Sequence, residues 1–289
     1  MIATAKKTNE IIKKYNLKIK KGFGQNFIIE PGIVEKIARL SNCEGIAVIE
    51  IGPGIGALTQ QLALLSKKVV SYEIDKSLIP VLKDTLSNYD NVQIINEDFL
   101  NVNLKEVSDN LINKYGNVVV CANLPYYVTT PILFKIFESD TRIDTITVMV
   151  QKEVADRFNA SVSSSDYNAL SVITQYLYDV KILMKVNKNV FNPKPKVDSA
   201  VIQFVKKDFI EEIDRYKFFE FVKACFKQRR KTLNNNLKEY INDSDIIENI
   251  YLKTNIDKNI RAQQLSLDKF IEMYKVYEEL LWEKMHMRK

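Results

Sequence analysis

The chain has 289 residues, of which 46% are hydrophobic and 27% charged, and its formal net charge is +6. This length and composition suit a soluble globular protein with one large domain and a smaller second one. No apolar run approaches the roughly 18–20 residues of a membrane span, and the lysine-rich first 21 residues lack the apolar core of a secretory signal. The sequence therefore argues against a membrane protein and against a secreted one.

The first two-thirds of the chain alternates short β-branched runs with amphipathic stretches, a pattern typical of a parallel, doubly wound sheet. Strands are predicted over 47–51, 68–73, 92–96, 118–122 and 145–150, with helices between them, for example over 32–40, 57–66 and 77–88. Thr130 and Pro131 indicate the N-cap and first turn of a helix over 131–137. Two further runs, 180–186 and 200–205, could close the sheet as an antiparallel edge hairpin.

After about residue 207 the pattern changes to helices alone. Apolar residues at helical spacing predict helices over 216–228, 232–240, 244–252 and 267–282. We therefore expect a sheet-bearing domain over residues 1–207, whose first 21 residues form a basic arm, and an all-α domain over residues 208–289.

The positive charge is gathered in three islands. Lysine and arginine outnumber aspartate and glutamate by 7 to 1 in residues 6–21, by 7 to 1 in residues 181–207, and by 5 to 0 in residues 223–231. Any one island could be no more than a solvated surface. Three islands together favour a polyanionic partner, most simply a nucleic acid.

Three glycines, Gly52, Gly54 and Gly56, directly follow the first predicted strand. Glycines let the backbone pass close to a ligand at the carboxyl end of a strand, where doubly wound sheets bind nucleotides. Their spacing is one residue shorter than the dinucleotide fingerprint. A tight strand-to-helix turn would explain one or two of these glycines but hardly all three.

Acidic residues follow the next two predicted strands. Glu73 ends the second strand, where a carboxylate can bridge ribose hydroxyls, whereas Asp75 is the better candidate to cap the following helix. Asp98 follows the third strand and could accept a hydrogen bond from an adenine amino group, although alone it would more simply be a surface acid. Together with the glycines, and without a P-loop lysine, these acids indicate a nucleoside ligand without phosphate. S-adenosylmethionine meets that description better than NAD.

The segment Asn123-Leu124-Pro125-Tyr126 follows the fourth strand, and its parts fit one task. The Asn123 amide oxygen and the Leu124 carbonyl can accept the two N–H bonds of an amine, which would stabilise positive charge developing on its nitrogen. Pro125 fixes the turn, and Tyr126 offers a face on which a base can stack, with core packing as the alternative. Nothing here is a strong base or nucleophile, which suits methyl transfer to an adenine amine by alignment.

Other catalytic chemistries find little support. Cys43, Cys121 and Cys225 are far apart and match no disulfide or zinc spacing, which favours a reducing, cytoplasmic compartment. The single histidine, His286, lies near the C-terminus, so chemistry that needs a central histidine is disfavoured. We expect no metal and no membrane partner, and a monomer is the simplest assembly.

These motifs resemble the rRNA adenine N6-dimethyltransferase family over nearly the whole chain, and most closely its bacterial branch that dimethylates two adjacent adenosines near the 3′ end of small-subunit (16S) rRNA. Residues 52–56, Glu73, Asp98 and residues 123–126 fall in order on the family's cofactor and catalytic motifs. The resemblance implies an α/β fold, with a Rossmann-like class I methyltransferase sheet and a small C-terminal all-α domain that binds RNA. It also implies S-adenosyl-L-methionine as cofactor, and small-subunit rRNA or the immature small ribosomal subunit as partner.

Two loops outside these motifs also resemble the family. Residues 24–28 are similar to its amino-terminal cofactor motif, which assigns Gln25, Asn26 and Ile28 to the cofactor; the family usually has leucine at the position of Ile28. Residues 191–199 resemble its post-catalytic loop, in which Phe191 would sandwich the target base, with core packing as an evenly weighted alternative.

The family commonly follows the catalytic tetrapeptide with Asn-Ile-Ser-Thr-Pro, whereas residues 127–131 read Tyr-Val-Thr-Thr-Pro. This difference bears on the shape of the target pocket.

Residues 226–237 resemble the family's linker-proximal helical signature. We expect Arg229, Arg230 and Lys231 to begin a helix and to contact phosphates, with a solvated helix face as the alternative. Lysines of residues 6–21 are expected to form a mobile arm that orders on RNA.

Two other functions stay open. One is a large-subunit rRNA methyltransferase of the erythromycin-resistance type, which Thr130-Pro131 and residues 193–199 disfavour on resemblance alone. The other is a non-catalytic ribosome-assembly RNA-binding factor on the same fold.

Overall fold

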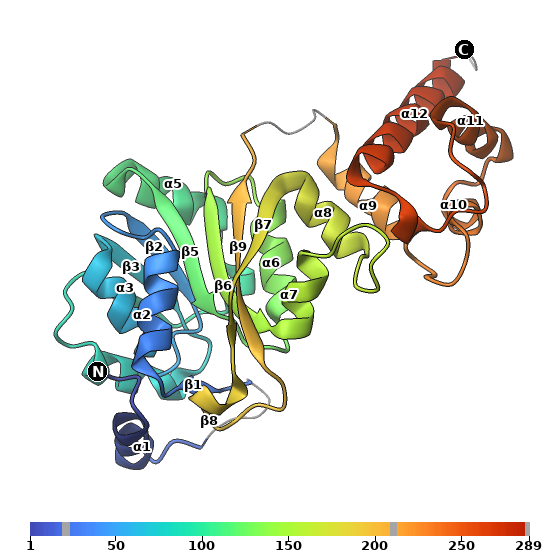
Figure 1. Ribbon diagram of the computed structural model, residues 1–289. Helices are drawn as coiled ribbons and strands as arrows, with labels where there is room; N and C mark the ends of the chain where they lie inside the picture. Colours follow the sequence, from blue (N-terminus) through green and yellow to red (C-terminus); the bar gives the residue numbers. More distant parts are fainter. Residues whose placement is uncertain (19–23, 209–212, 287–289) are drawn as a thin grey trace. The chain divides into compact units, whose positions relative to one another are not determined.

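The computed structural model describes residues 1–18, 24–208 and 213–286 (Figure 1), and the chain divides into two compact units. We call them the sheet unit, Met1–Ala155 with Val180–Lys206, and the helical unit, Asp156–Asp179 with Lys207–Lys289. The division after Lys206 lies close to the expected boundary, but residues 156–179 join the helical unit instead of the sheet-bearing domain.

Aromatic packing explains why this internal segment belongs with the C-terminal helices. Tyr176 lies on α8 (Ala169–Leu177), and its ring centroid is 5.0 Å from that of Phe218 and 6.2 Å from that of Phe219. Both phenylalanines are buried on α9 (Arg215–Cys225). A contact of this kind between segments far apart in sequence leaves no local sequence signal.

A seven-stranded sheet forms the centre of the sheet unit, in the order β4-β3-β2-β5-β6-β9-β7. Its strands are β2 (Ala47–Ile51), β3 (Lys68–Tyr72), β4 (Val92–Ile95), β5 (Val118–Asn123), β6 (Thr145–Gln151), β7 (Tyr178–Val186) and β9 (Ser199–Lys206). The pairs β2–β3, β2–β5, β3–β4 and β5–β6 are parallel, whereas β9 runs antiparallel to β6. The predicted doubly wound sheet with an antiparallel edge is confirmed.

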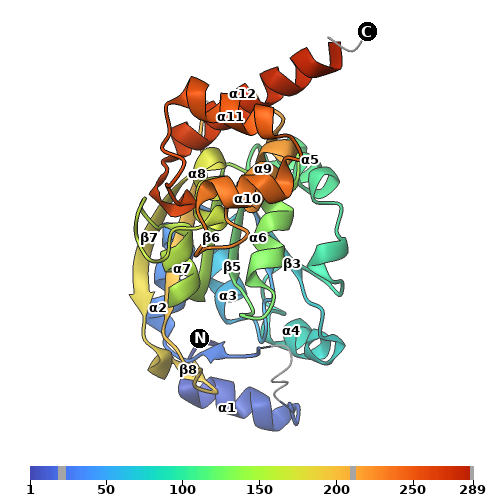
Figure 2. The same ribbon diagram turned by 90° about the vertical axis from the view of Figure 1, so that its right-hand side faces the viewer.

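The apolar strand runs are explained by burial on both faces of the sheet. Every residue of β2 is buried, and so is all of β5 except its last residue. Helices cover both faces (Figures 1 and 2), with α2 (Pro31–Leu40) packed against α3 (Ala57–Leu65). The other helices of this unit are α1 (Ala5–Lys14), α4 (Ile79–Thr85), α5 (Leu104–Tyr115) and α6 (Thr129–Glu138), and α7 (Lys152–Phe158) crosses the division. Two short strands, β1 (Phe27–Ile28) and β8 (Phe191–Asn192), pair separately and antiparallel.

The N-terminal residues form structure instead of a mobile arm. Thr4 caps α1, and its Oγ1 accepts a hydrogen bond from the Lys7 N–H at 3.1 Å. Ile2 and Ile11 are buried in the hydrophobic core. The predicted mobile arm is therefore wrong for the described part of this segment, because an N-cap and an apolar helix face fix it despite its lysines. The last residues of the predicted arm, 19–21, lie outside the described residues.

The helix after the segment 123–126 starts two residues earlier than predicted. α6 begins at Thr129, whose Oγ1 donates to the Pro125 carbonyl at 3.0 Å. The prediction that Thr130 caps a helix starting at Pro131 is therefore wrong. Pro131 falls within the first turn, where backbone N–H groups have no intrahelical partner, so a proline is tolerated there.

The helical unit is built around aromatic residues. Its other helices are α10 (Leu233–Tyr240), α11 (Ser244–Thr254) and α12 (Leu267–His286), so the four predicted C-terminal helices are confirmed with small shifts at their ends. Phe218 and Phe221 of α9 both contact Tyr274 of α12, with centroids 5.4 and 5.6 Å apart. None of the helices in the described ranges combines the length and the apolarity needed to span a membrane.

Candidate active site

A cavity of about 350 Å³ lies in the sheet unit, lined by residues at the carboxyl ends of β2, β3 and β5. Its lining includes four acidic side chains, Glu50, Glu73, Glu97 and Asp98, and no lysine or arginine of the described residues. The carboxyl ends of such strands are where doubly wound sheets bind nucleotides. The negative charge of the lining disfavours a ligand with a phosphate group and favours a ligand that is neutral or positively charged.

Most of the residues predicted for cofactor binding and catalysis meet in this cavity. They are Gln25, Asn26, Ile28, Gly52, Gly54, Glu73, Asp98, Asn123, Leu124, Pro125 and Tyr126. Two predicted residues, Gly56 and Phe191, do not line it.

The positions of Gly56 and Phe191 have other physical explanations. Gly56 precedes α3 with a φ of +91°, and a Cβ there would come within 3.1 Å of the Leu86 side chain, so it serves the turn and close packing. Phe191 is 3% exposed and belongs to the hydrophobic core, with its backbone paired to Ile28. Its side chain thus lies where the core-packing alternative expects it, and its stacking role stays a prediction.

The glycine turn after β2 holds a carboxylate and approaches the tetrapeptide. Gly52 and Gly54 have φ values of +67° and +60°, a conformation that strains other residues. The Gly54 N–H donates to Glu73 Oε2 at 3.3 Å. A Cβ on Gly52 would lie 3.7 Å from the Pro125 ring, so the two segments are in close contact.

Glu73 is 5% exposed at the end of β3, and the Asp75 N–H donates to its other oxygen at 2.8 Å. Burial raises the pKa of Glu73 to about 7, although backbone donors from Asp75 and Gly54 act in the opposite direction. A carboxylate offers about four acceptor positions, so capacity remains for hydroxyl donors of a ligand. Asp75 itself accepts from the Ser77 N–H at 3.0 Å, which confirms its predicted role as a cap.

Residues 24–28, the predicted amino-terminal cofactor motif, contact the same region through Asp75. Gln25 Nε2 donates to Asp75 Oδ2 at 2.8 Å, and Asn26 Nδ2 donates to the Gly24 carbonyl at 3.0 Å. Ile28 is buried in β1. These contacts fix the loop against the cavity wall.

Glu50 is a cavity residue that the sequence reasoning missed. It lies within β2, is 1% exposed, and accepts a hydrogen bond from Ser71 Oγ at 2.6 Å. Burial raises the pKa of Glu50 to about 7, with Glu73 adding to the shift. The sequence signal for Glu50 is a single acidic residue inside an otherwise apolar strand. Burying a carboxylate costs free energy, so acidic residues are rarely buried unless they have a partner or a function.

Asp98 and Tyr127 also line the cavity. Asp98 Oδ1 accepts from the Leu100 N–H at 2.9 Å, which leaves its other oxygen without a partner among the described residues. Tyr127, a residue that the sequence reasoning noted only as a departure from the family pattern, is half-exposed and lines the cavity. Its ring lies against Gly24, where an added Cβ would come within 3.5 Å.

The tetrapeptide is held at both ends while the Asn123 amide stays available. Leu124 is buried, and its N–H donates to the Met149 carbonyl at 3.1 Å. The Tyr126 and Ser199 hydroxyls share a hydrogen bond of 2.7 Å, which ties the stacking candidate to the first residue of β9. Within the described part of the chain, the Asn123 side chain makes no hydrogen bond.

The three predicted RNA-binding residues lie in the turn between α9 and α10. Arg229, Arg230 and Lys231 are all exposed, but none of them is helical, so the prediction that they begin a helix is wrong. α10 starts at Leu233 with Thr232 as its cap. Arg229 Nη2 donates to the Ser165 carbonyl of the same unit.

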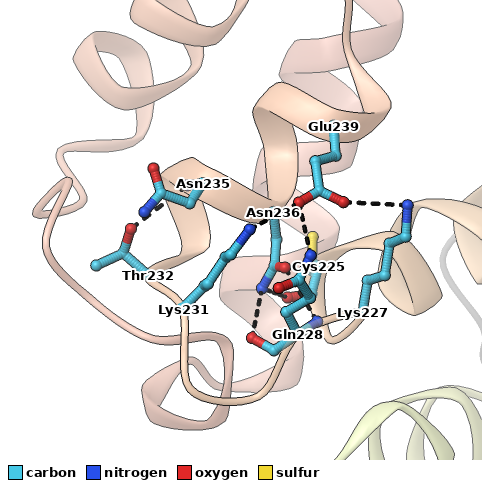
Figure 3. Close-up of polar contacts among 8 residues, drawn as sticks. All are labelled: Cys225, Lys227, Gln228, Lys231, Thr232, Asn235, Asn236 and Glu239. Atoms are coloured by element: carbon cyan, nitrogen blue, oxygen red, sulfur yellow. Dashed lines mark hydrogen bonds and ion pairs between the residues drawn. The ribbon is translucent and has the colours of Figure 1, made fainter.

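A buried asparagine holds this basic turn in place (Figure 3). Asn236 of α10 is 1% exposed, and its Nδ2 donates to the carbonyls of Cys225 at 2.8 Å and Gln228 at 3.2 Å. Its Oδ1 accepts from the Gln228 N–H at 3.0 Å. The basic turn between α9 and α10 is therefore fixed by a tertiary contact.

Glu239 sits at the centre of the charges around the turn (Figure 3). Its carboxylate forms ion pairs with Lys227 and Lys231, each at 3.1 Å, and accepts a hydrogen bond from Gln228 Nε2 at 2.7 Å. The two lysines hold the pKa of Glu239 below its ordinary value. In contrast, Arg230 has no partner within the described ranges.

No cluster of three or more histidine, cysteine, aspartate or glutamate side chains suited to a metal ion occurs in residues 1–18, 24–208 and 213–286. The three cysteines are buried and free.

Known proteins are similar to this chain in sequence and in fold. The sequence pattern described as ribosomal RNA adenine dimethylase matches residues 16–279. The ribosomal RNA small subunit methyltransferase A of Bacillus cytotoxicus is 47% identical over 277 residues, covering 93% of this chain and 94% of the relative. The protein of that name from Staphylococcus aureus (strain Newman) is 44% identical over 280 residues, covering 94% of each.

Solved structures give the same picture of the fold. A dimethyladenosine transferase from Plasmodium falciparum superposes with a TM-score of 0.73 at 25% identity, covering 87% of this chain and 97% of that one. The 23S rRNA methyltransferase ErmE superposes with a TM-score of 0.67 at 23% identity, covering 87% and 99%. The likeness to ErmE shows the fold alone.

Proposed function

The chain belongs to the ribosomal RNA adenine dimethylase family, and from this premise we propose that it dimethylates N6 of two adjacent adenosines near the 3′ end of small-subunit rRNA. S-adenosylmethionine is the methyl donor, and the immature small ribosomal subunit is the partner. The observation that carries the proposal is the Asn123 amide, which lines an acidic cavity in a chain 47% identical to a small-subunit rRNA methyltransferase.

The residues of the cavity fit this cofactor. Glu73 keeps acceptor capacity for ribose hydroxyls, and one oxygen of Asp98 stays available for an adenine amino group. The acidic lining favours a sulfonium cation over a phosphate. When bound, S-adenosylmethionine would supply a methyl group on a positively charged sulfur that leaves as a neutral thioether; the methylated amine then loses a proton to water, and the reaction needs no metal.

The tetrapeptide supports the target amine. Asn123 Oδ1 and the Leu124 carbonyl accept the two N–H bonds of the adenine amino group, which localises the nitrogen lone pair and stabilises the charge that develops there. Tyr126 stacks on the base after it has turned out of the RNA, a contact worth roughly 1–3 kcal/mol. Its hydrogen bond to Ser199 keeps the ring in one orientation.

RNA binding draws on the helical unit. We assign residues 208–289 to target binding, with Arg229, Arg230 and Lys231 contacting phosphates from the exposed turn before α10. The enzyme acts as a monomer in the cytoplasm.

The alternative functions are disfavoured. Relatives at 43–47% identity are named for the small subunit, whereas the large-subunit enzyme ErmE is similar only in fold. A non-catalytic assembly factor would not need Glu73, Asp98 and Asn123 together in one cavity.

Substitution of Asn123 tests the proposal. Asn123→Ala should lower methyl transfer to unmethylated small subunits about 10²–10³-fold, since one stabilising group of the reacting centre is removed, while calorimetry still detects S-adenosylmethionine binding. Asn110→Ala is the matched control, because Asn110 is an exposed asparagine on α5 outside the cavity. Mass spectrometry of the rRNA should locate the methyl groups near the 3′ end of the small-subunit rRNA. Near-normal turnover of Asn123→Ala would contradict the mechanism, and methylation of large-subunit rRNA instead would contradict the substrate.

A further inference from the structure

The lysines of α1 fall into two groups. Lys7 and Lys14 are paired, with Glu10 at 3.7 Å and with Asp84 at 2.6 Å. Lys6 and Lys13 are exposed and have no acidic partner within the described ranges. Residues three and four apart share one face of a helix, so Lys6 and Lys13 lie on either side of Asn9. The unpaired charge of the helix is therefore gathered around one polar residue.

Asn9 joins this face to a second lysine-rich segment. Asn192 Nδ2 in β8 donates to Asn9 Oδ1 at 2.9 Å, a contact between residues 183 positions apart. Figures 1 and 2 both show α1 beside β8. The loop that follows β8 carries Lys194 and Lys196, which are exposed and also lack an acidic partner in the described part of the chain.

The acidic residue of this loop forms no ion pair with the loop's lysines. Asp198 Oδ1 accepts a hydrogen bond from the backbone N–H of Lys188, which precedes β8, at 2.9 Å, and its side chain has no basic partner among the described residues. The contact between Asn9 and Asn192 thus places parts of two of the three basic islands, α1 and the loop after β8, beside each other on the sheet unit. β8 pairs with β1, which contributes Phe27 and Ile28 to the wall of the cavity.

We propose that Lys6, Lys13, Lys194 and Lys196 form one phosphate-binding surface that holds the RNA substrate on the sheet unit. This inference rests on the proposed function and deepens it, since it assigns RNA contacts to the unit that contains the cavity. Ammonium groups without counter-ions attract the phosphate backbone of RNA and read no sequence. The surface therefore contributes affinity and orientation, whereas the tetrapeptide selects the base.

Paired and unpaired lysines of one helix provide a matched experiment. Lys6→Gln/Lys13→Gln removes two unpaired charges, and Lys7→Gln/Lys14→Gln removes two paired charges from the same helix. Lys194→Gln/Lys196→Gln tests the other half of the surface. Binding of each full-length variant to protein-free small-subunit rRNA is measured at several salt concentrations, and methylation of unmethylated small subunits is measured in parallel.

We expect the first and third variants to bind RNA more weakly, with a salt dependence shallower by about 1 for each lysine that no longer meets a phosphate. For a pair of lysines, a fourfold rise in salt then weakens the variant about 16-fold less than the unmodified protein. KM for the small subunit should rise while kcat and S-adenosylmethionine affinity stay unchanged. The Lys7→Gln/Lys14→Gln control should differ less from the unmodified protein.

The lysine surface and the proposed function can be refuted separately. If the unmodified protein methylates small-subunit rRNA but all three variants show the same salt dependence, the lysine surface is refuted and the function stands. If the unmodified protein binds the RNA with the expected dependence on Lys6 and Lys13 but does not methylate unmethylated small subunits, the function is refuted and the surface stands. A control variant that weakens binding as much as Lys6→Gln/Lys13→Gln would refute the distinction between paired and unpaired charges.

Discussion

The cavity of the sheet unit and the basic turn of the helical unit hold their charges in opposite ways. Glu50 and Glu73 are buried among backbone and hydroxyl donors, and burial raises the pKa of each to about 7. Glu239 is exposed beside two lysines, which lower its pKa. The cavity shields its carboxyl groups from water, whereas the basic turn leaves its charged groups exposed to water and pairs them with opposite charges.

This contrast decides how strongly each region should respond to a change. A buried carboxylate has few solvent partners, so its charge depends on the donors that a ligand brings. An exposed ion pair is screened by water and salt and contributes at most about 1 kcal/mol. We therefore expect large, pH-dependent effects from the cavity and small, salt-dependent effects from the turn.

Glu73→Gln should have the largest effect among the tests of this contrast. Hydrogen bonds to a charged acceptor are worth about 1.5–3 kcal/mol each, so removal of the carboxylate should weaken S-adenosylmethionine binding roughly 10- to 100-fold. The pKa of Glu73, about 7 in the free protein against an ordinary 4.5, means that the folded chain keeps a proton that the unfolded chain loses between these values. Folding stability should thus fall as pH rises through this window.

Cofactor affinity should show the opposite trend, because ribose hydroxyls donate best to the ionised acid. Affinity should rise with pH toward and above 7, and binding near pH 6.5 should release a proton. Calorimetry in buffers of different ionisation enthalpy measures that release. Glu50→Gln is the matched control, since Glu50 lies in the same cavity with a similarly raised pKa. If proton release persists in Glu73→Gln but disappears in Glu50→Gln, the acid that loses its proton on cofactor binding is Glu50, and the prediction for Glu73 is wrong.

Asn236→Ala should have an intermediate effect, on stability. It removes both donors to the Cys225 and Gln228 carbonyls and the acceptor for the Gln228 N–H. Unsatisfied groups of this kind cost about 1–3 kcal/mol, and denaturant unfolding should show the decrease. Asn235→Ala is the control, because Asn235 is exposed and its side chain makes no hydrogen bond within the described ranges. Equal effects of the two substitutions would show that the turn is not held by Asn236.

The same contrast explains what could be predicted from the sequence. Strands such as β2 were predicted with their observed bounds, because strands buried on both faces have continuous apolar runs. Glu73 and Asn123 were brought to one cavity by topology alone, since parallel strands end at one edge of a sheet. The buried acid Glu50 had a visible signal, a single charge within an apolar run.

Features that depend on distant contacts could not be predicted. The Tyr126–Ser199 hydrogen bond joins residues 73 positions apart, and the Asn9–Asn192 bond joins residues 183 positions apart. The basic turn before α10 is held by the Asn236 side chain, and local sequence does not reveal that contact. Local pattern predicts elements, whereas loops that carry charge are shaped by partners elsewhere in the chain.

The smallest expected effects come from the exposed charges of the turn, and they should run in opposite directions. Arg230→Ala removes a cation without a partner among the described residues, so RNA affinity should fall a few-fold and its salt dependence should become shallower by about 1. Glu239→Gln releases Lys227 and Lys231 from their shared carboxylate, so RNA affinity should rise a few-fold. Stability should change by no more than about 0.5 kcal/mol in Arg230→Ala. Titration with small-subunit rRNA at two salt concentrations measures both variants, and a Glu239→Gln protein that binds RNA more weakly would mean that its ion pairs shape the turn instead of restraining its charge.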